Sequence, residues 1–142
     1  MNPLRLTLAL ILFLVAPLSA ADVAKEDLHI YLLIGQSNMA GRAPLGEATA
    51  EIEGCLLLNA DNEWEAAKTP LNRYSTIRKG LGMQKLNPGS SFASAMKKAN
   101  PKATIGLVVN AKGGSKIEQW ATGTRFHKGL LERTQNDGSL AL

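Results

Sequence analysis

Short apolar runs alternate along the chain with stretches of small and polar residues. The runs that suit buried strands span residues 29–34, 55–58 and 104–109, and 139–142 begin a similar pattern. Apolar residues at helical spacing predict helices over about 88–99 and 124–135, the first of them stopped by Asn100-Pro101. Strands alternating with helices are typical of a parallel sheet covered on both faces. We therefore expect an α/β fold in which 29–34, apolar on both faces, is a central strand.

The first apolar run leads directly into Gly35-Gln36-Ser37-Asn38-Met39-Ala40-Gly41-Arg42. A strand, a tight turn and a helix in succession place Ser37 at the carboxyl end of a strand, where open α/β sheets have their ligand crevices. Two interpretations stay open. Ser37 is a nucleophile whose own amide donates to an oxyanion, or it caps the following helix. The pattern is not the Gly-x-Ser-x-Gly elbow of the α/β-hydrolases.

A second turn of this kind follows the run 104–109, at Ala111-Lys112-Gly113-Gly114-Ser115. Ser115 and Glu118 have the spacing of a capping box, which predicts a helix that opens directly after the two glycines. Glycine amides beside a helix terminus suit a developing oxyanion or a small anion. The alternative is a plain strand-to-helix turn without a ligand.

Between these two turns lies a long connection, residues 69–88, which is rich in Gly, Pro, Asn and basic residues. Connections of this length are uncommon in compact domains unless they have a role, and we expect this one to flank the site crevice. Residues 59–64 predict a turn that returns into an extended arm with Trp64. This tryptophan either stacks on a sugar or, as is commoner, anchors a loop.

The amino terminus has the three parts of a secretory signal peptide. One positive charge is followed by the apolar stretch 6–15 and by small residues at 16–21, which predicts cleavage after Ala20 or Ala21. About ten strongly apolar residues are too few for a membrane anchor, which needs roughly 20. The chain therefore divides into a signal peptide, 1–21, and one domain, 22–142, that is secreted or periplasmic, with no stable membrane anchor after cleavage.

Composition excludes several classes of function. The 142 residues allow one small domain, and the net charge of +4 is scattered without interleaved aromatics, so nucleic acid is not an expected partner. Cys55 is the single cysteine, so no internal disulfide forms, and its apolar neighbours predict a buried, inert thiol. Two histidines and one cysteine cannot form a spaced ligand cluster, so we expect no metal and no cofactor.

Three ordered motifs carry a family resemblance: Gly35 to Arg42, Pro88-Gly89-x-x-Phe92-Ala93, and Ala111-x-Gly113-Gly114-Ser115-x-Ile117-x-x-Trp120. Together they resemble the nucleophile block, the next helix opening and the oxyanion-glycine block of the sialate O-acetylesterase-like carbohydrate esterases, a branch of the SGNH hydrolase superfamily. The resemblance implies a three-layer α/β/α, flavodoxin-like parallel sheet. It covers the amino-terminal part of such a domain only.

The resemblance also implies roles for individual residues. Ser37 would attack an acetyl ester on a sugar and donate its amide to the oxyanion, and Gly113 or Gly114 would be the second donor. The other candidates for substrate contacts are Gln36, Asn38, Lys112 and Ser115. The expected partner is an O-acetylated carbohydrate, and the oligomeric state stays open.

The family's later blocks, of the types Trp-x-Gln-Gly-Glu-Ser and Asp-x-x-His, have no counterpart in the sequence, and neither His29 nor His127 has the second pattern. A serine without a general base is a weak nucleophile near neutral pH. We therefore expect a secreted serine esterase that removes O-acetyl groups from sugars or polysaccharides, truncated after its early strands and catalytically incomplete as written. The alternative is a non-catalytic carbohydrate- or anion-binding remnant, in which Lys112 and Lys116 attract negative charge. A phosphate-binding loop at 112–116 lacks the P-loop spacing.

Overall fold

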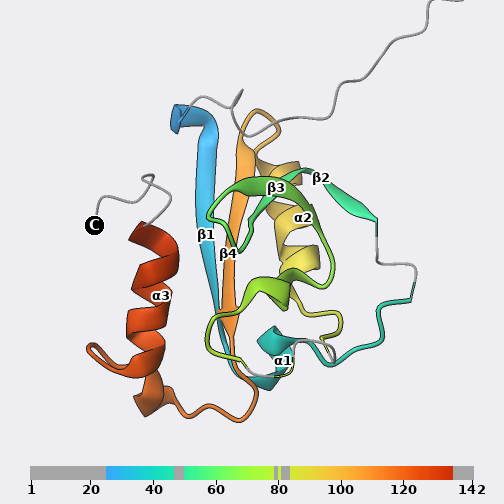
Figure 1. The fold of residues 1–142 in the computed structure, drawn as a ribbon. Helices are drawn as coiled ribbons and strands as arrows, with labels where there is room; N and C mark the ends of the chain where they lie inside the picture. The colour runs from blue at the N-terminus through green and yellow to red at the C-terminus, as the bar shows by residue number, and fades with distance from the viewer. Residues whose placement is uncertain (1–24, 47–49, 79, 81–83, 136–142) are drawn as a thin grey trace, which may run out of the picture.

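The computed structural model describes residues 25–46, 50–78, 80 and 84–135. Within them a four-stranded sheet has the order β1-β4-β2-β3 (Figure 1). The strands are β1 (Leu28–Gly35), β2 (Glu51–Leu58), β3 (Trp64–Lys68) and β4 (Thr104–Ala111). The neighbours β1, β4 and β2 are parallel, whereas β3 runs antiparallel to β2. The α/β class is confirmed, and the sheet is mixed rather than wholly parallel.

The antiparallel strand arises from a tight turn between β2 and β3. The Asn59 side-chain oxygen accepts hydrogen bonds from the amides of Asp61 and Glu63, at 2.9 and 3.0 Å, and Asn62 has a positive φ of 61°. Such a turn sends the chain straight back beside the strand that it left. The predicted arm is thus a paired strand, and its Trp64 ring lies over Gly106 of β4, where a Cβ atom would be 2.9 Å from the indole.

The first strand does not take the predicted central position within the described sheet. Among the described strands β1 lies at the edge of the sheet, and its Leu32 and Ile34 side chains are 39% and 40% exposed. An apolar run indicates that both faces of a strand are suited to burial, but the order of strands depends on which of them pair. That pairing is not encoded in any single run.

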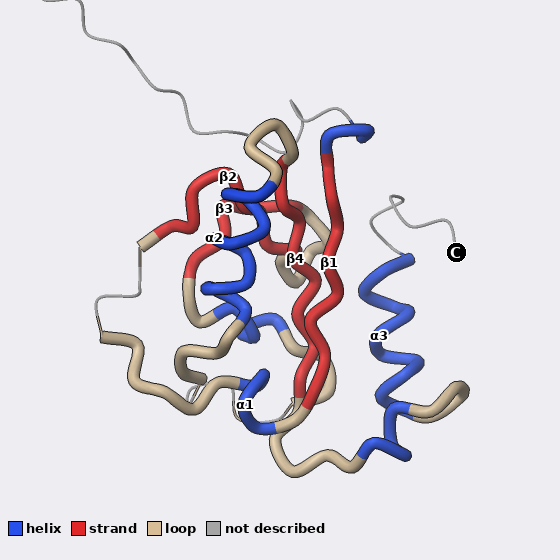
Figure 2. The backbone as a smooth tube through the Cα atoms, turned by 180° about the vertical axis from the view of Figure 1, so that it is seen from behind, coloured by secondary structure: helices blue, strands red, loops and turns tan. Residues whose placement is uncertain are grey.

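Helices cover both faces of the sheet, which gives three layers (Figures 1 and 2). Helix α2 (Gly89–Ala99) brings Ala93 into a core with Leu57, Leu107 and Val109. Side chains alternate across a strand, so Asn110 points to the opposite face, where it donates to the Gly129 carbonyl of α3 (Arg125–Gln135) at 3.1 Å. Both helices agree with the sequence prediction to within one residue.

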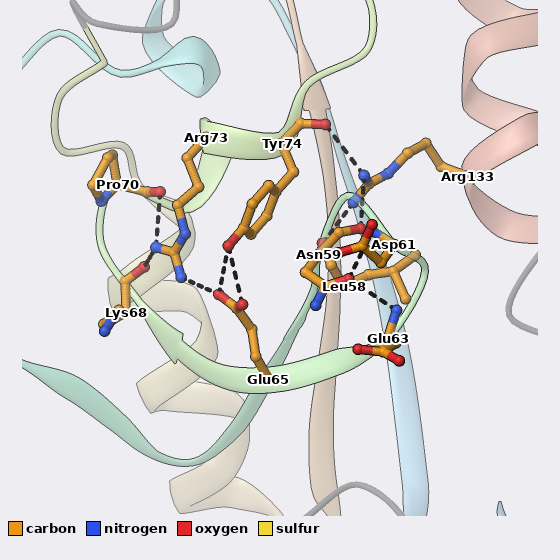
Figure 3. A network of polar contacts seen from close by, with 10 residues as sticks. All are labelled: Leu58, Asn59, Asp61, Glu63, Glu65, Lys68, Pro70, Arg73, Tyr74 and Arg133. Atoms are coloured by element: carbon orange, nitrogen blue, oxygen red, sulfur yellow. Dashed lines mark hydrogen bonds and ion pairs between the residues drawn. The ribbon is translucent and has the colours of Figure 1, made fainter.

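Arg133 ties α3 to the sheet and to the connection after β3 (Figure 3). Its buried guanidinium donates to the carbonyls of Leu58, Asn59 and Tyr74, at 2.6, 3.1 and 3.2 Å. Burial lowers the pKa of Arg133, and the nearby Tyr74 opposes that shift. A buried cation is tolerated here because three carbonyl oxygens replace its water.

Two predicted segments, the signal peptide 1–21 and the strand start at 139–142, lie outside the described residues. No helix in the part of the chain that the structure describes is long and apolar enough to cross a membrane.

Candidate active site

Ser37 lies where β1 ends. It is the first residue of the short helix α1 (Ser37–Ala40), and its hydroxyl donates to the Gln36 side-chain oxygen at 3.1 Å. Of the two interpretations of Ser37, the helix cap is wrong, because Gln36 occupies the cap position and makes no capping bond through its side chain. The Ser37 hydroxyl is therefore half-exposed and not committed to the backbone.

The second glycine turn follows β4 and lies at the same edge of the sheet, because β1 and β4 are parallel and in register from Leu28↔Thr104 to Gly35↔Ala111. The Lys112 amide extends this pairing by donating to the Gly35 carbonyl at 2.9 Å. The two strand ends therefore bring the two turns together, as the sequence predicts for carboxyl ends of neighbouring parallel strands.

Gly113 is the glycine that lies against the serine. A Cβ atom added to Gly113 would be 3.8 Å from the Ser37 Cα atom, 4.0 Å from its Cβ atom and 3.1 Å from Nη2 of Arg42. Gly114 has a φ of +74° and faces open space. Among the described residues, the amides of Ser37 and Gly113 make no hydrogen bond, so both remain available to an acceptor.

The α-helix predicted after the two glycines was wrong. Only a four-residue 3₁₀ turn, η5 (Ile117–Trp120), is formed, and Ser115 does not cap it. The Ser115 hydroxyl instead accepts from the Trp120 indole at 3.1 Å, and the Lys116 amide donates to the Gln119 side chain at 2.8 Å. A turn this short has no appreciable macrodipole, so any help to an oxyanion comes from single amides.

Buried side-chain amides hold these turns in place. Asn72, fully buried in η3 (Leu71–Tyr74), donates to the Ala111 carbonyl at 3.1 Å and accepts from the Ala111 amide at 2.9 Å. Asn87 donates to the Met39 carbonyl at 2.8 Å and accepts from the Gly89 amide at 2.9 Å, which links α1 to the start of α2. The long connection 69–88 thus buttresses the site, in agreement with the sequence prediction.

A cavity of about 440 Å³ is lined in part by Gly113, the glycine that lies against Ser37, and its charged lining is entirely cationic. The residues that line it are Arg42, Ile77, Arg78, Lys112, Gly113 and Arg125. Arg78 is held by a 2.9 Å hydrogen bond to the Ala40 carbonyl, and the Lys112 ammonium lies 5.7 Å from the centre of the Phe126 ring. None of the four cations forms an ion pair with a described residue.

The remaining predicted site residues have different surroundings. Asn38 lines a separate cavity, of about 410 Å³, together with Arg42, Asn87 and Ser91. Lys112 lines the cationic cavity, whereas Lys116 is exposed and is not among its lining residues. Ser115 is engaged by Trp120, so its hydroxyl faces the η5 turn.

No described histidine is placed to serve Ser37. His29 is the second residue of β1, at the opposite end of that strand, and His127 Nδ1 accepts from the Gly123 amide at 3.4 Å. The Gln36 oxygen can orient the Ser37 hydroxyl, but an amide oxygen is far too weakly basic to take its proton. In the described residues no three His, Cys, Asp or Glu side chains gather where they could hold a metal ion.

The sequence and the fold of this chain both resemble those of known proteins. A family model described as carbohydrate esterase, sialic acid-specific acetylesterase, matches residues 27–140. The chain belongs to this carbohydrate esterase family. A probable carbohydrate esterase of Arabidopsis thaliana is 34% identical to it, over 75% of this chain and 46% of that protein. The X-ray structure of an Arabidopsis thaliana protein superposes with a TM-score of 0.65 at 32% identity, over 77% of this chain and 50% of that one.

The chain spans about half the length of these two relatives. Within the esterase domain, sequence reasoning missed the arginines that line the cavity. Arg42 was visible in the first motif, but Arg78 lies in an irregular connection and Arg125 opens a helix, so no local pattern joins them. Only the fold, which collects loops at one edge of the sheet, brings them together.

Proposed function

We propose that this chain is the nucleophile-bearing part of a serine esterase that removes O-acetyl groups from carbohydrates. The Ser37 oxygen would form a bond to the acetyl carbonyl carbon, and the sugar would leave as its oxygen gains a proton. Water would then hydrolyse the acetyl-serine and release acetate. The observation that carries the proposal is the placement of Gly113 against Ser37 in a chain of this family.

The oxyanion would form between the amides of Ser37 and Gly113. Both amides lie at the carboxyl edge of the sheet, and both are without a hydrogen-bond partner among the described residues. Amides fixed in this way stabilise the charge that develops on the carbonyl oxygen. We assign the second donor to Gly113 rather than Gly114, because Gly114 has nothing within 4 Å of its Cβ position.

The chain as given would be slow. In the described residues Ser37 has no general base, and site groups without a base retain roughly 10³–10⁴-fold acceleration over water. A small base from solution would then fill the role, and the acetyl-serine would accumulate because its hydrolysis needs a base as well. No metal or cofactor enters this reaction.

The test is acetylation of the full chain by p-nitrophenyl acetate, with and without imidazole, followed by mass spectrometry of the tryptic peptides. We expect acetyl on the peptide that contains Ser37, formed and released faster with imidazole. Ser37→Ala should remove the signal, and Ser94→Ala, an exposed serine on α2, should leave it unchanged. Equal labelling of the Ser37→Ala protein would refute the assignment.

A second function is favoured by the cationic cavity itself. A non-catalytic module that binds an acidic glycan would need the cations but not the serine. Saturable glycan binding that survives Ser37→Ala, with no acetyl transfer to Ser37 in wild type even with imidazole, would favour this function over the esterase. In this case Lys112, which lines the cavity, contributes to binding, and Lys116 does not.

Secretion is a separate proposal that rests on residues 1–21. Expression of the full chain in a secreting bacterial host should yield a mature protein in the periplasm or medium, beginning at Ala21 or Asp22. Amino-terminal sequencing decides the point. A protein that retains Met1 in the membrane fraction would contradict it.

A further inference from the structure

A second cavity, of about 400 Å³, adjoins the cationic cavity, because the two share Ile77 and Arg125 in their linings. The second is lined by Thr76, Ile77, Arg125, Lys128, Gly129 and Glu132. Together they form one trough, which we call the cationic trough, along the connection after η3 and the first turns of α3. Gly113, which lies against Ser37, lines one end of the trough, and Lys128 and Glu132 line the other.

The charges of the cationic trough are strongly unbalanced. Five cations line it, Arg42, Arg78, Lys112, Arg125 and Lys128, against the single carboxylate of Glu132. The one ion pair among the described residues, between Arg73 and Glu65, lies elsewhere. Cations gathered in a concave surface without counter-charges raise the local potential and attract anions.

The shape and the charge together indicate the ligand. A single acidic sugar has one carboxylate, which would leave most of these cations unmatched. Two adjoining cavities of about 440 and 400 Å³ instead provide room for successive sugars, each with its own carboxylate. Three of the cations are arginines, whose planar forks match carboxylates in bidentate geometry.

A nucleic acid is also a polyanion, but the trough does not suit it. No aromatic side chain is among the residues that line either cavity. Proteins that bind single-stranded nucleic acid stack its bases on aromatic rings. A polyuronate offers hydroxyls and carboxylates instead, and these match the polar lining.

We propose that the cationic trough binds an extended polyuronate, a polysaccharide with a carboxylate on each sugar, and that it presents an O-acetyl group of this polymer to Ser37. This substrate class rests on the proposed esterase function, but binding to the trough does not need catalysis. Arg125, which lines both cavities, is the central specificity-determining residue. Arg78 and Lys112 bind the sugar nearest to Ser37, and Lys128 binds the next one.

The test measures binding of unesterified oligogalacturonates to full-length Ser37→Ala protein by calorimetry at low salt, so that no turnover interferes. We expect the tetramer to bind at least about tenfold more tightly than the monomer, because it spans both cavities. Binding should weaken with salt, as screening predicts. Arg125→Ala should weaken tetramer binding about tenfold and Lys128→Ala about fivefold.

Lys102→Ala is the matched control, because it removes a cation from the cavity at the opposite end of the sheet. Circular dichroism checks folding of each variant, and Arg125→Glu, at an exposed site, gives a second, stronger loss. Four results would overturn the proposal: equal affinity for monomer and tetramer, equal affinity for neutral xylan oligomers, tighter binding of single-stranded DNA, or equal weakening by Lys102→Ala. Failure of acetyl transfer to Ser37 would instead overturn the esterase function and leave the binding result standing.

Discussion

The two ends of the sheet each have a cavity of about 440 Å³, and the difference between them shows what makes a site. The cavity at the amino end is lined by Asp27, His29 and Lys102, together with residues of the turn before β4. Its charges are mixed, and no serine or glycine turn faces it. At the carboxyl end two parallel strands end side by side, so their turns and cations meet. Strand direction, rather than cavity volume, decides which end can do chemistry.

Ser37 and Cys55 make the same contrast. Ser37 is half-exposed at the carboxyl end, whereas Cys55 of β2 lies under α2 and is 3% exposed. Its sulfur lies 3.8 Å from the Ala93 carbonyl. Burial raises the pKa of the Cys55 thiol, and the Lys97 ammonium offsets part of that rise. The more reactive type of side chain is thus placed where no ester reaches it.

The largest expected difference between the two ends is in the side-chain hydrogen bonds that support each of them. Asn110 is fully buried on β4 and makes four hydrogen bonds to Ser75, Thr76 and Gly129, at 2.9 to 3.2 Å. Asn110→Ala leaves several of these buried groups unpaired and should lower the free energy of unfolding by about 2–4 kcal/mol. The connection with Arg78 would also loosen, so acetyl transfer to Ser37 should fall.

Lys97→Met is the counterpart at the amino end. The Lys97 ammonium donates to the carbonyls of Pro101 and Ala103, at 3.0 and 2.8 Å, from a half-exposed position. Solvent replaces these bonds, so the free energy of unfolding should fall by about 1 kcal/mol or less, and acetyl transfer to Ser37 should be unchanged. Urea unfolding and Ser37 acetylation measure both variants. A loss of acetyl transfer in Lys97→Met as large as in Asn110→Ala would contradict the comparison.

A smaller effect, confined to the carboxyl end, separates the two glycines. Gly113→Ala places a methyl group 3.1 Å from the Arg42 guanidinium and about 4 Å from Ser37, in the space that an ester would enter. Misplacement on this scale costs about tenfold to a hundredfold in rate. Gly114→Ala faces open space, and its positive φ should cost stability of about 1 kcal/mol but little activity.

The rate of Ser37 acetylation at saturating p-nitrophenyl acetate, corrected for the folded fraction of each variant, distinguishes the two positions. If Gly114→Ala were the slower protein, the oxyanion donor would be reassigned to Gly114. Equal rates would show that neither glycine lies on the path of the ester.

Much of the fold could be predicted from the sequence because its signals are local. The apolar runs and stop signals gave three strands and two helices, and glycines placed Ser37 and Gly113 at strand ends. Register and order are not local, so the edge position of β1 was missed. The antiparallel β3 strand was anticipated only as an extended arm, because its pairing depends on the turn at Asn59.

The site was predicted less completely than the fold for a related reason. Ser37 and the glycines stand in motifs, but the cations of the trough come from four separate segments. The helix expected at Ser115 failed because the Trp120 indole engages the Ser115 hydroxyl, and the capping position moves on to Lys116, whose amide donates to the Gln119 side chain at the start of a short 3₁₀ turn. A capping spacing cannot reveal such competitors.

The smallest effect concerns Cys55 and the pH. Its folded-state pKa is raised above the ordinary thiol value of 9.0, so the folded state keeps its proton at a pH where the unfolded state has lost it. The associated stability is fully present below pH 9.0 and is lost as the pH rises through the raised value. The free energy of unfolding, measured with urea, should therefore fall more between pH 8 and pH 10 in wild type than in Cys55→Ala. A thiol reagent at pH 8 should label Cys55 only in urea, and rapid labelling of the folded protein would show that the amino end is as accessible as the Ser37 end.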